Sequence, residues 1–274
     1  MIITGITPFA NDAFAFAALE QGMVNTELKY SISYKDLEEL NQMALANNGD
    51  LNKISFNTLG KILENYVLLP VGSCIGFNNG PKIVAKEKFS LKDMKNKKIG
   101  IPGTNTTAYM LLKILAPHAA EELIFPYHEL TKKVAEGTID CALTIHETRF
   151  QIEELGLSEI GDIFELWMDK TDSPLPLGGV VANRALGAEK ITRITSDLEN
   201  SLKKAFEDKN MALEFALKHS FKKDISFVEK NVDLYVNQET MKLSEAGIKS
   251  IQCLLDLGYE AGILPKPSKN WLFG

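Results

Sequence analysis

The stretch GPKIVAK, residues 80–86, separates two series of strand and helix patterns. It is an extended run after a glycine-rich turn, and a new series begins directly behind it. A second extended, glycine-bearing run, LPLGGVVANR, lies at residues 175–184. One lobe interrupted by another complete lobe, with two such crossings, is the topology of a hinged protein. We therefore predict a first lobe of residues 1–84 and 180–274 and a second lobe of residues 85–179.

Outward from these crossings, strand patterns alternate with helix patterns. Ile2–Ile6 is a short β-branched run, and Asn11 and Asp12 begin a helix that Gly22 ends. Repeated strand–helix order favours an open parallel sheet with helices on both faces. We predict an α/β fold with two lobes and a cleft between them, in the manner of a type II periplasmic binding protein. A single large doubly wound sheet is the alternative.

Composition excludes several classes of protein. The chain has 274 residues, 45% of them hydrophobic, so it can fill more than one core. A net charge of −6 without clustered Lys and Arg argues against a nucleic-acid partner. Apolar runs such as Tyr66–Val71 are far shorter than the roughly 20 residues of a membrane span. No export signal is visible at the N-terminus, so we expect a soluble, cytoplasmic protein without a membrane partner.

The three cysteines, Cys74, Cys141 and Cys253, stand far apart in the sequence. None of them has the CxxC or CxxH spacing that is typical of metal or redox sites. We expect buried free thiols and no metal site.

Three polar segments each follow a predicted strand. Ligands of parallel α/β sheets bind outside the carboxyl ends of strands, where loops lead into helix N-termini. The segments are PFAND at 8–12, KISFN at 53–57 and PGTNTTAY at 102–109. Lys53 and Ser55 are candidate binding residues of the second segment. An ion-paired or solvated lysine and simple helix capping are the alternatives.

Thr106 and Thr107 stand where the third segment becomes helical. Their hydroxyls could donate hydrogen bonds, and the helix start behind them favours a carboxylate or a phosphate. Plain N-capping of the helix is the alternative, because Ser, Thr and Asn are common at that position.

The segment ALTIHETRF, residues 142–150, is the most informative for chemistry. An apolar strand ends there in His146, Glu147 and Arg149, at the place where a cleft would lie. Imidazole has a pKa near 6.5, so His146 could act as a base at neutral pH. Glu147 could fix the tautomer of the ring. A structural histidine is the alternative.

Taken together, these segments resemble the 1,4-dihydroxy-6-naphthoate synthase family of the futalosine route to menaquinone. Each motif is weak alone, but six in register from end to end make a specific match. The matching stretches are ND at 11–12, KIS at 53–55, PGTNTTAY at 102–109, IHETRF at 145–150, LPLG at 175–178 and YVN at 235–237.

The resemblance implies a reaction and a site. Cyclic dehypoxanthine futalosine, a small anionic substrate, would be cleaved to 1,4-dihydroxy-6-naphthoate by a lyase that needs no metal or organic cofactor. His146 would be the base that removes a proton. Lys53, Ile54 and Ser55 would line one side of the substrate, and Thr106, Thr107 and Ala108 the other. Supporting contacts would come from four further residues, Asn11, Asp12, Glu147 and Arg149.

The first motif departs from the family pattern. It usually reads SPCPND, whereas this chain has Thr7, Pro8, Phe9, Ala10, Asn11 and Asp12. Phe9 could reshape the wall of the cleft and alter the substrate in detail.

Two other functions remain open on the sequence. One is a non-catalytic protein of the same fold that binds a small acid. The other is the related chorismate dehydratase, although the TTAY and IHE motifs favour the synthase.

Overall fold

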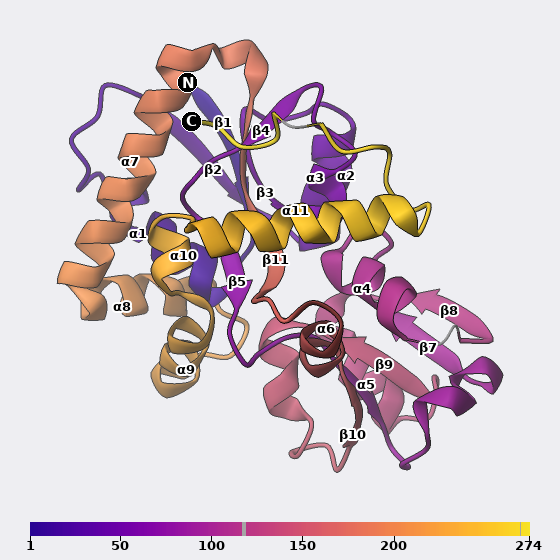
Figure 1. Ribbon diagram of the computed structural model, residues 1–274. Coiled ribbons are helices and arrows are strands. Elements are labelled where there is room, and N and C mark those ends of the chain that lie inside the picture. Colours follow the sequence, from indigo (N-terminus) through magenta and orange to yellow (C-terminus); the bar gives the residue numbers. More distant parts are fainter. Residues whose placement is uncertain (117–118, 269) are drawn as a thin grey trace.

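The structure, a computed structural model, describes residues 1–116, 119–268 and 270–274, and the side chain of Glu147 lies outside the described part. Two sheets form the centres of two lobes (Figure 1). The first sheet has the order β2-β1-β3-β11-β4, and β5 also pairs with β11. Its strands are β1 (Ile2–Ile6), β2 (Tyr30–Tyr34), β3 (Leu51–Ser55), β4 (Tyr66–Leu68), β5 (Cys74–Gly76) and β11 (Leu175–Asn183).

The second sheet has the order β10-β6-β9-β7-β8. Its strands are β6 (Lys82–Ala85), β7 (Lys98–Ile101), β8 (Glu121–Ile124), β9 (Cys141–Thr144) and β10 (Ser158–Asp162). The two-lobed α/β prediction is therefore confirmed.

The predicted purely parallel sheet is wrong. β1 is parallel to β2 and β3, but β11 is antiparallel to β3, β4 and β5. In the second sheet β6 is likewise antiparallel to β9 and β10. The reason is that the crossing strands enter each sheet directly from the other lobe, without the crossover helix that a parallel neighbour requires.

The sheets also place both crossings a few residues earlier than the predicted limits at 84/85 and 179/180. β6, which begins at Lys82, already belongs to the second sheet, and β11 belongs to the first sheet from Leu175 onward. Glycine and proline signals mark a turn, but only strand pairing shows to which sheet the following residues belong.

Helices cover both lobes, and those after β11 return to the first (Figure 1). The first lobe has α1 (Ala10–Glu20), α2 (Leu37–Leu45), α3 (Phe56–Leu59), η4 (Arg184–Leu186), α7 (Ala188–Glu207), α8 (Lys209–His219), α9 (Ile225–Tyr235), α10 (Gln238–Met241) and α11 (Glu245–Glu260). The second lobe has η1 (Leu91–Asn96), α4 (Thr107–Leu115), η2 (Tyr127–Glu129), α5 (Leu130–Ala135), η3 (His146–Gln151) and α6 (Ile163–Thr171).

Local sequence explains where these helices begin and end. The side chain of Asp36 accepts a hydrogen bond from the N–H of Glu38 and so caps α2. Gly22 takes a positive φ of 70° directly after α1, a conformation that glycine adopts without steric cost. None of the helices in the described ranges is long and apolar enough to cross a membrane.

The lobes are packed together rather than merely linked. The largest cluster of buried apolar side chains contains residues of both, among them Ile54 and Phe56 of the first lobe and Ile99 and Leu143 of the second. Burial of apolar area on both sides of the cleft therefore holds the lobes in contact.

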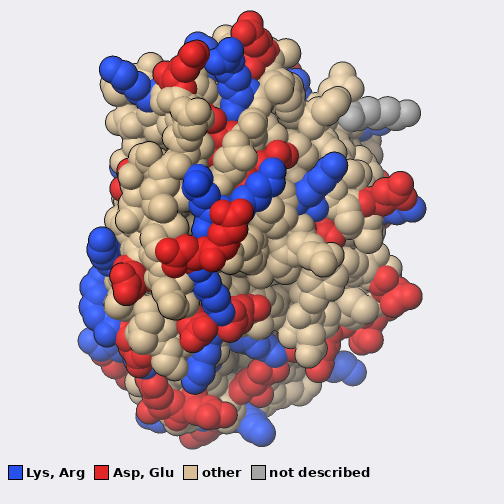
Figure 2. All heavy atoms as spheres, turned by 90° about the vertical axis from the view of Figure 1, so that its left-hand side faces the viewer, with Lys and Arg blue, Asp and Glu red and all other residues tan. Residues whose placement is uncertain are grey.

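The surface is polar by contrast. On the face shown in Figure 2, acidic and basic side chains are interspersed.

Gly178 of β11 lies opposite Ser55 of β3, against the backbone of that strand. A Cβ atom at this position would come within 2.5 Å of the backbone carbonyl oxygen of Ile54. At Gly161 of β10 an added Cβ would meet only the end of the Leu91 side chain, at 2.9 Å. A backbone carbonyl held in a sheet cannot move aside, whereas a leucine methyl group can.

We therefore expect Gly178→Ala to lower the free energy of unfolding by about 1–3 kcal/mol and Gly161→Ala to cost clearly less. Urea unfolding of the two variants and the wild type measures both values. Equal losses would show that β11 can move away from β3.

Candidate functional site

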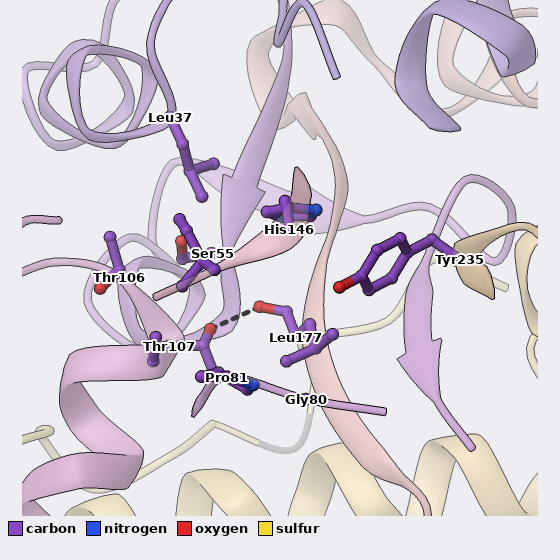
Figure 3. Close-up of a pocket in the computed structure, with 11 residues that line it drawn as sticks. Leu37, Ser55, Gly80, Pro81, Thr106, Thr107, His146, Leu177 and Tyr235 are labelled. Carbon is purple, nitrogen blue, oxygen red and sulfur yellow. Dashed lines mark hydrogen bonds between the residues drawn. The ribbon is translucent and has the colours of Figure 1, made fainter. Parts of the chain in front are cut away.

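A cavity lies between the lobes and is lined from both (Figure 3). Its volume is about 30 Å³, enough for a few water molecules at most. The lining residues are Leu37, Ser55, Gly80, Pro81, Thr106, Thr107, Ala108, Ile145, His146, Leu177 and Tyr235. Five residues named from the sequence are thus brought together here: Ser55, Thr106, Thr107, Ala108 and His146.

His146 follows β9 and begins η3, at the strand end where the sequence placed it. Its backbone is left-handed, with φ at 48°, which is uncommon for a residue other than glycine and is typical of functional sites. The imidazole stacks on the ring of Phe9, with centroids 3.9 Å apart, and lies 5.1 Å from the ring centroid of Tyr235. Among the described residues, its Nδ1 atom is buried without a hydrogen-bond partner.

The surroundings of His146 keep its ring neutral. Burial, together with the positive charge of Lys53, lowers the pKa of His146 from 6.5 to about 3. Both effects disfavour the imidazolium, so the ring carries no charge at pH 7. A neutral imidazole with an unoccupied nitrogen can accept a proton, which is what a general base must do.

Lys53 forms a buried ion pair with Asp12. Its Nζ lies 2.8 Å from Asp12 Oδ1 and donates a hydrogen bond to the carbonyl of Gly72 at 3.2 Å. Thr7 and Asn11 also donate hydrogen bonds to the Asp12 carboxylate, at 2.5 and 2.9 Å. Lys53 and Asp12 are each about 95% buried or more, and neither lines the cavity. Lys53 therefore acts on the site through its positive charge, which contributes to the lowered pKa of His146.

The N-terminus of α4 faces the cavity with two residues named from the sequence. Thr106 caps the helix, since its Oγ1 accepts a hydrogen bond from the N–H of Tyr109 and donates one to the carbonyl of Gly103. Thr107 connects the lobes, since its Oγ1 donates to the Leu177 carbonyl (Figure 3) and accepts from the N–H of Phe56. Both hydroxyls are therefore engaged with protein groups, and contact with a substrate stays a prediction.

The backbone of α4 offers a different binding group. Within the described ranges, the N–H groups of Thr107 and Ala108 have no hydrogen-bond partner, and both residues line the cavity. Free N–H groups at a helix start attract anions.

Ser55 and Ile54 differ in position although they are neighbours in β3. Ser55 lines the cavity, and its hydroxyl accepts a hydrogen bond from the Asn41 side chain at 3.2 Å. Ile54 is fully buried in the core and does not line the cavity. Alternation along a strand explains the difference.

Arg149 and Glu147, also named from the sequence, are not seen to contribute to the cavity. Arg149 lines a separate surface depression with Lys82 and Lys88, so a supporting contact to His146 is not seen. The Glu147 side chain lies outside the described residues.

Six lining residues were not named as site residues from the sequence: Leu37, Gly80, Pro81, Ile145, Leu177 and Tyr235. All but Leu37 lie in stretches that the sequence singled out, namely the two crossings, the IHETRF motif and the YVN motif, but no signal connected them with the site.

In the described ranges, no group of three or more His, Cys, Asp and Glu side chains could hold a metal ion. Cys74 and Cys141 are buried free thiols, and burial raises the pKa of each to about 12, so both stay protonated. The expectation of a buried thiol is wrong for Cys253, which is only partly buried on α11.

Comparison with known sequences settles the family. The sequence pattern of a family described as "Menaquinone biosynthesis" matches residues 2–260. The chain belongs to the menaquinone biosynthesis family. It is 31% identical to a 1,4-dihydroxy-6-naphthoate synthase of Streptomyces coelicolor, over 94% of this chain and 93% of the relative. A synthase of the same name from Thermus thermophilus is 30% identical, over 98% and 97%.

Solved structures confirm the binding-protein fold for this family member. A protein from Archaeoglobus fulgidus superposes with a TM-score of 0.91 at 29% identity, covering 96% of this chain and 98% of that one. An alkanesulfonate-binding protein from Xanthomonas axonopodis, 15% identical, has a TM-score of 0.72 and covers 99% and 96%. The second likeness shows the fold alone.

The buried ion pair between Lys53 and Asp12 leads to a prediction about the stability of the protein. Asp12→Ala leaves the Lys53 ammonium buried without its counter-charge, so we expect the free energy of unfolding to fall by about 3–5 kcal/mol. Adding Lys53→Met removes the stranded charge, and the double variant should be more stable than Asp12→Ala alone. Glu39→Ala, which breaks the exposed pair with Lys35, is the control and should cost less than about 1 kcal/mol.

Denaturant unfolding measures all three variants. A double variant no more stable than Asp12→Ala would mean that Lys53 is solvated without Asp12.

Proposed function

We propose that the chain is a 1,4-dihydroxy-6-naphthoate synthase, a lyase that cleaves cyclic dehypoxanthine futalosine. The names of the two relatives support this reaction for a member of the same family. The observation that carries the proposal is the neutral imidazole of His146, with its Nδ1 atom buried, on the wall of the cavity between the lobes. A passive binding site has no need of such a group.

The cavity suits an aromatic acid. Leu37, Pro81, Leu177 and the ring of Tyr235 supply apolar surface, and the start of α4 supplies free N–H groups for a carboxylate. His146 then removes a proton from the bound substrate, and the electrons released drive cleavage of the bond to the sugar-derived portion.

The substrate charge helps the base. An imidazolium would lie in a buried site near the Lys53 ammonium, and for this reason the pKa of His146 is low. A substrate carboxylate in the same cavity brings negative charge that favours the protonated ring. Binding of the anionic substrate thus makes the imidazole of His146 a stronger base.

Entry of the substrate requires the lobes to separate. The cavity is far smaller than a bicyclic aromatic acid, and hydrogen bonds join its two sides. Asn57 Nδ2 donates to the Thr104 carbonyl at 3.0 Å, and Thr58 Oγ1 donates to the Asn105 carbonyl at 3.1 Å. Opening at the two crossings breaks these contacts while each sheet stays intact.

His146→Asn tests the base. Asparagine is polar and of similar reach but cannot accept a proton at neutral pH, so we expect turnover of cyclic dehypoxanthine futalosine to fall by about 10²- to 10⁴-fold. Wild-type turnover should rise with pH as the imidazole loses its proton. Because the pKa of His146 is lowered, that rise should lie in the acid range, below pH 6.5, and be absent from the variant.

Exposed His128→Asn is the matched control and should leave both rate and pH profile unchanged. Turnover of His146→Asn equal to that of the wild type would overturn the assignment. Dehydration of chorismate by the wild type, with no naphthoate formed from the futalosine, would favour the dehydratase instead. Binding without turnover would favour a passive binding protein.

Thr107→Val tests the binding end of the cavity. The variant keeps the shape and loses the hydroxyl, and a hydrogen bond to a charged acceptor contributes about 1.5–3 kcal/mol. We expect the affinity for 1,4-dihydroxy-6-naphthoate to fall at least about tenfold by calorimetry. Thr195→Val, which loses a buried hydroxyl that donates to the Ile191 carbonyl within α7, away from the lining, is the control. Unchanged affinity with reduced stability would mean that Thr107 only joins the lobes.

A further inference from the structure

Four aromatic rings interleave across the cleft. Tyr127 and His146 come from η2 and η3 of the second lobe, and Phe9 and Tyr235 come from the ends of α1 and α9 in the first lobe. The order is Tyr127, Phe9, His146, Tyr235, so neighbouring rings always belong to different lobes. Successive ring centroids are 4.9, 3.9 and 5.1 Å apart.

Phe9 makes the closest of these contacts. Its ring is 27° from parallel to the imidazole of His146 and 85° from parallel to the ring of Tyr127. The side chain is 1% exposed and does not line the cavity. Its ring thus lies against the histidine rather than in the lining of the cavity, and an effect of Phe9 on the substrate stays a prediction.

The backbone of Phe9 is held as firmly as its ring. Its carbonyl accepts hydrogen bonds from the N–H groups of Asp12 and Ala13, at 3.1 and 3.0 Å, at the start of α1. Asp12 is in turn joined to Lys53 of β3. The backbone that carries the Phe9 ring is thus connected, through Asp12 and Lys53, to a central strand of the first sheet.

We propose that Phe9 is a positioning residue for His146, whose ring fixes the plane of the imidazole when the lobes close. This inference rests on the proposed function, in which His146 is the base. The Nδ1 atom of His146 has no hydrogen-bond partner in the described part of the chain, so no polar contact at that nitrogen orients the ring. Stacking on Phe9 and contact with Tyr235 supply the orientation instead.

Because the rings belong to both lobes, the imidazole takes up its working position only in the closed form. Lobe opening withdraws His146 from between Phe9 and Tyr235 and exposes it to water. Among the described residues, the charged group that acts on this position is the ammonium of Lys53, which is paired with the carboxylate of Asp12. Proton removal is thereby confined to substrate that the closed lobes enclose.

Phe9→Leu, compared with Phe14→Leu, tests the proposal. Phe14 is also fully buried in the same helix but packs in a different cluster, against Phe206, so its replacement leaves a similar defect away from His146. We expect Phe9→Leu to lower kcat about 10- to 10²-fold with little change in KM, because small displacements of a reacting group are costly. Phe14→Leu should lose comparable stability and keep the wild-type kcat. Phe9→Met serves as a second ring-free variant.

Proton NMR checks that Phe9 lies over the imidazole of His146 in solution, and the split between kcat and KM reports its role. The chain has four histidines, so the ring signals of His146 can be assigned from their loss in His146→Asn. These signals should shift in Phe9→Leu and not in Phe14→Leu, because only Phe9 lies over the imidazole.

Failure of this inference is distinct from failure of the proposed function. A kcat of Phe9→Leu and Phe9→Met equal to that of Phe14→Leu, with His146→Asn inactive, would overturn the role of Phe9 alone. Full activity of His146→Asn would overturn both. A further loss of activity when Phe9→Leu is added to His146→Asn would also contradict a role exercised through His146.

Discussion

The two-lobed structure depends on strand β11. It carries the chain back from the second lobe and pairs in the first sheet with β3, β4 and β5. Its first half also reaches the cleft, where the Leu177 carbonyl accepts the hydrogen bond from Thr107. Gly178 follows, with no room for a Cβ beside β3. One strand therefore completes a sheet, forms a crossing and contributes to the wall of the cavity.

The electrostatics of the site follow from a charge that is buried but compensated. Lys53 would be costly to bury alone, and Asp12 and the Gly72 carbonyl compensate for its desolvation. The ammonium still acts on His146 and, with burial, keeps the ring neutral. The imidazole is therefore already in its neutral form at pH 7, the form that can accept a proton.

Under the proposed function, closure of the lobes joins binding to chemistry. The contacts between the lobes hold the start of α4 against β3 and α3 and place His146 between Phe9 and Tyr235. The fold is shared with a protein that binds a sulfonate, so the fold itself is not specific to catalysis. Under the proposed function, the difference lies in a side chain that can take a proton and is held by rings from the opposite lobe.

Local signals in the sequence determined the order of strands and helices, the two crossings and the strand end that carries His146, because turn residues and apolar periodicity act over a few residues. Three strands were not predicted. Tyr30–Tyr34 and Ser158–Asp162 are half-exposed edge strands without a continuous apolar run, and Cys74–Gly76 is only three residues long. The sequence likewise identified the segments PFAND, KISFN and PGTNTTAY. It did not show which of their side chains line the cavity.

Only the tertiary structure decided how these segments meet. Lys53 pairs with Asp12 instead of facing the cavity, and Phe9 lies against His146 rather than in its wall. These contacts join residues 41 and 137 positions apart. No local pattern specifies such a pairing, because it depends on how two sheets and two lobes pack against each other.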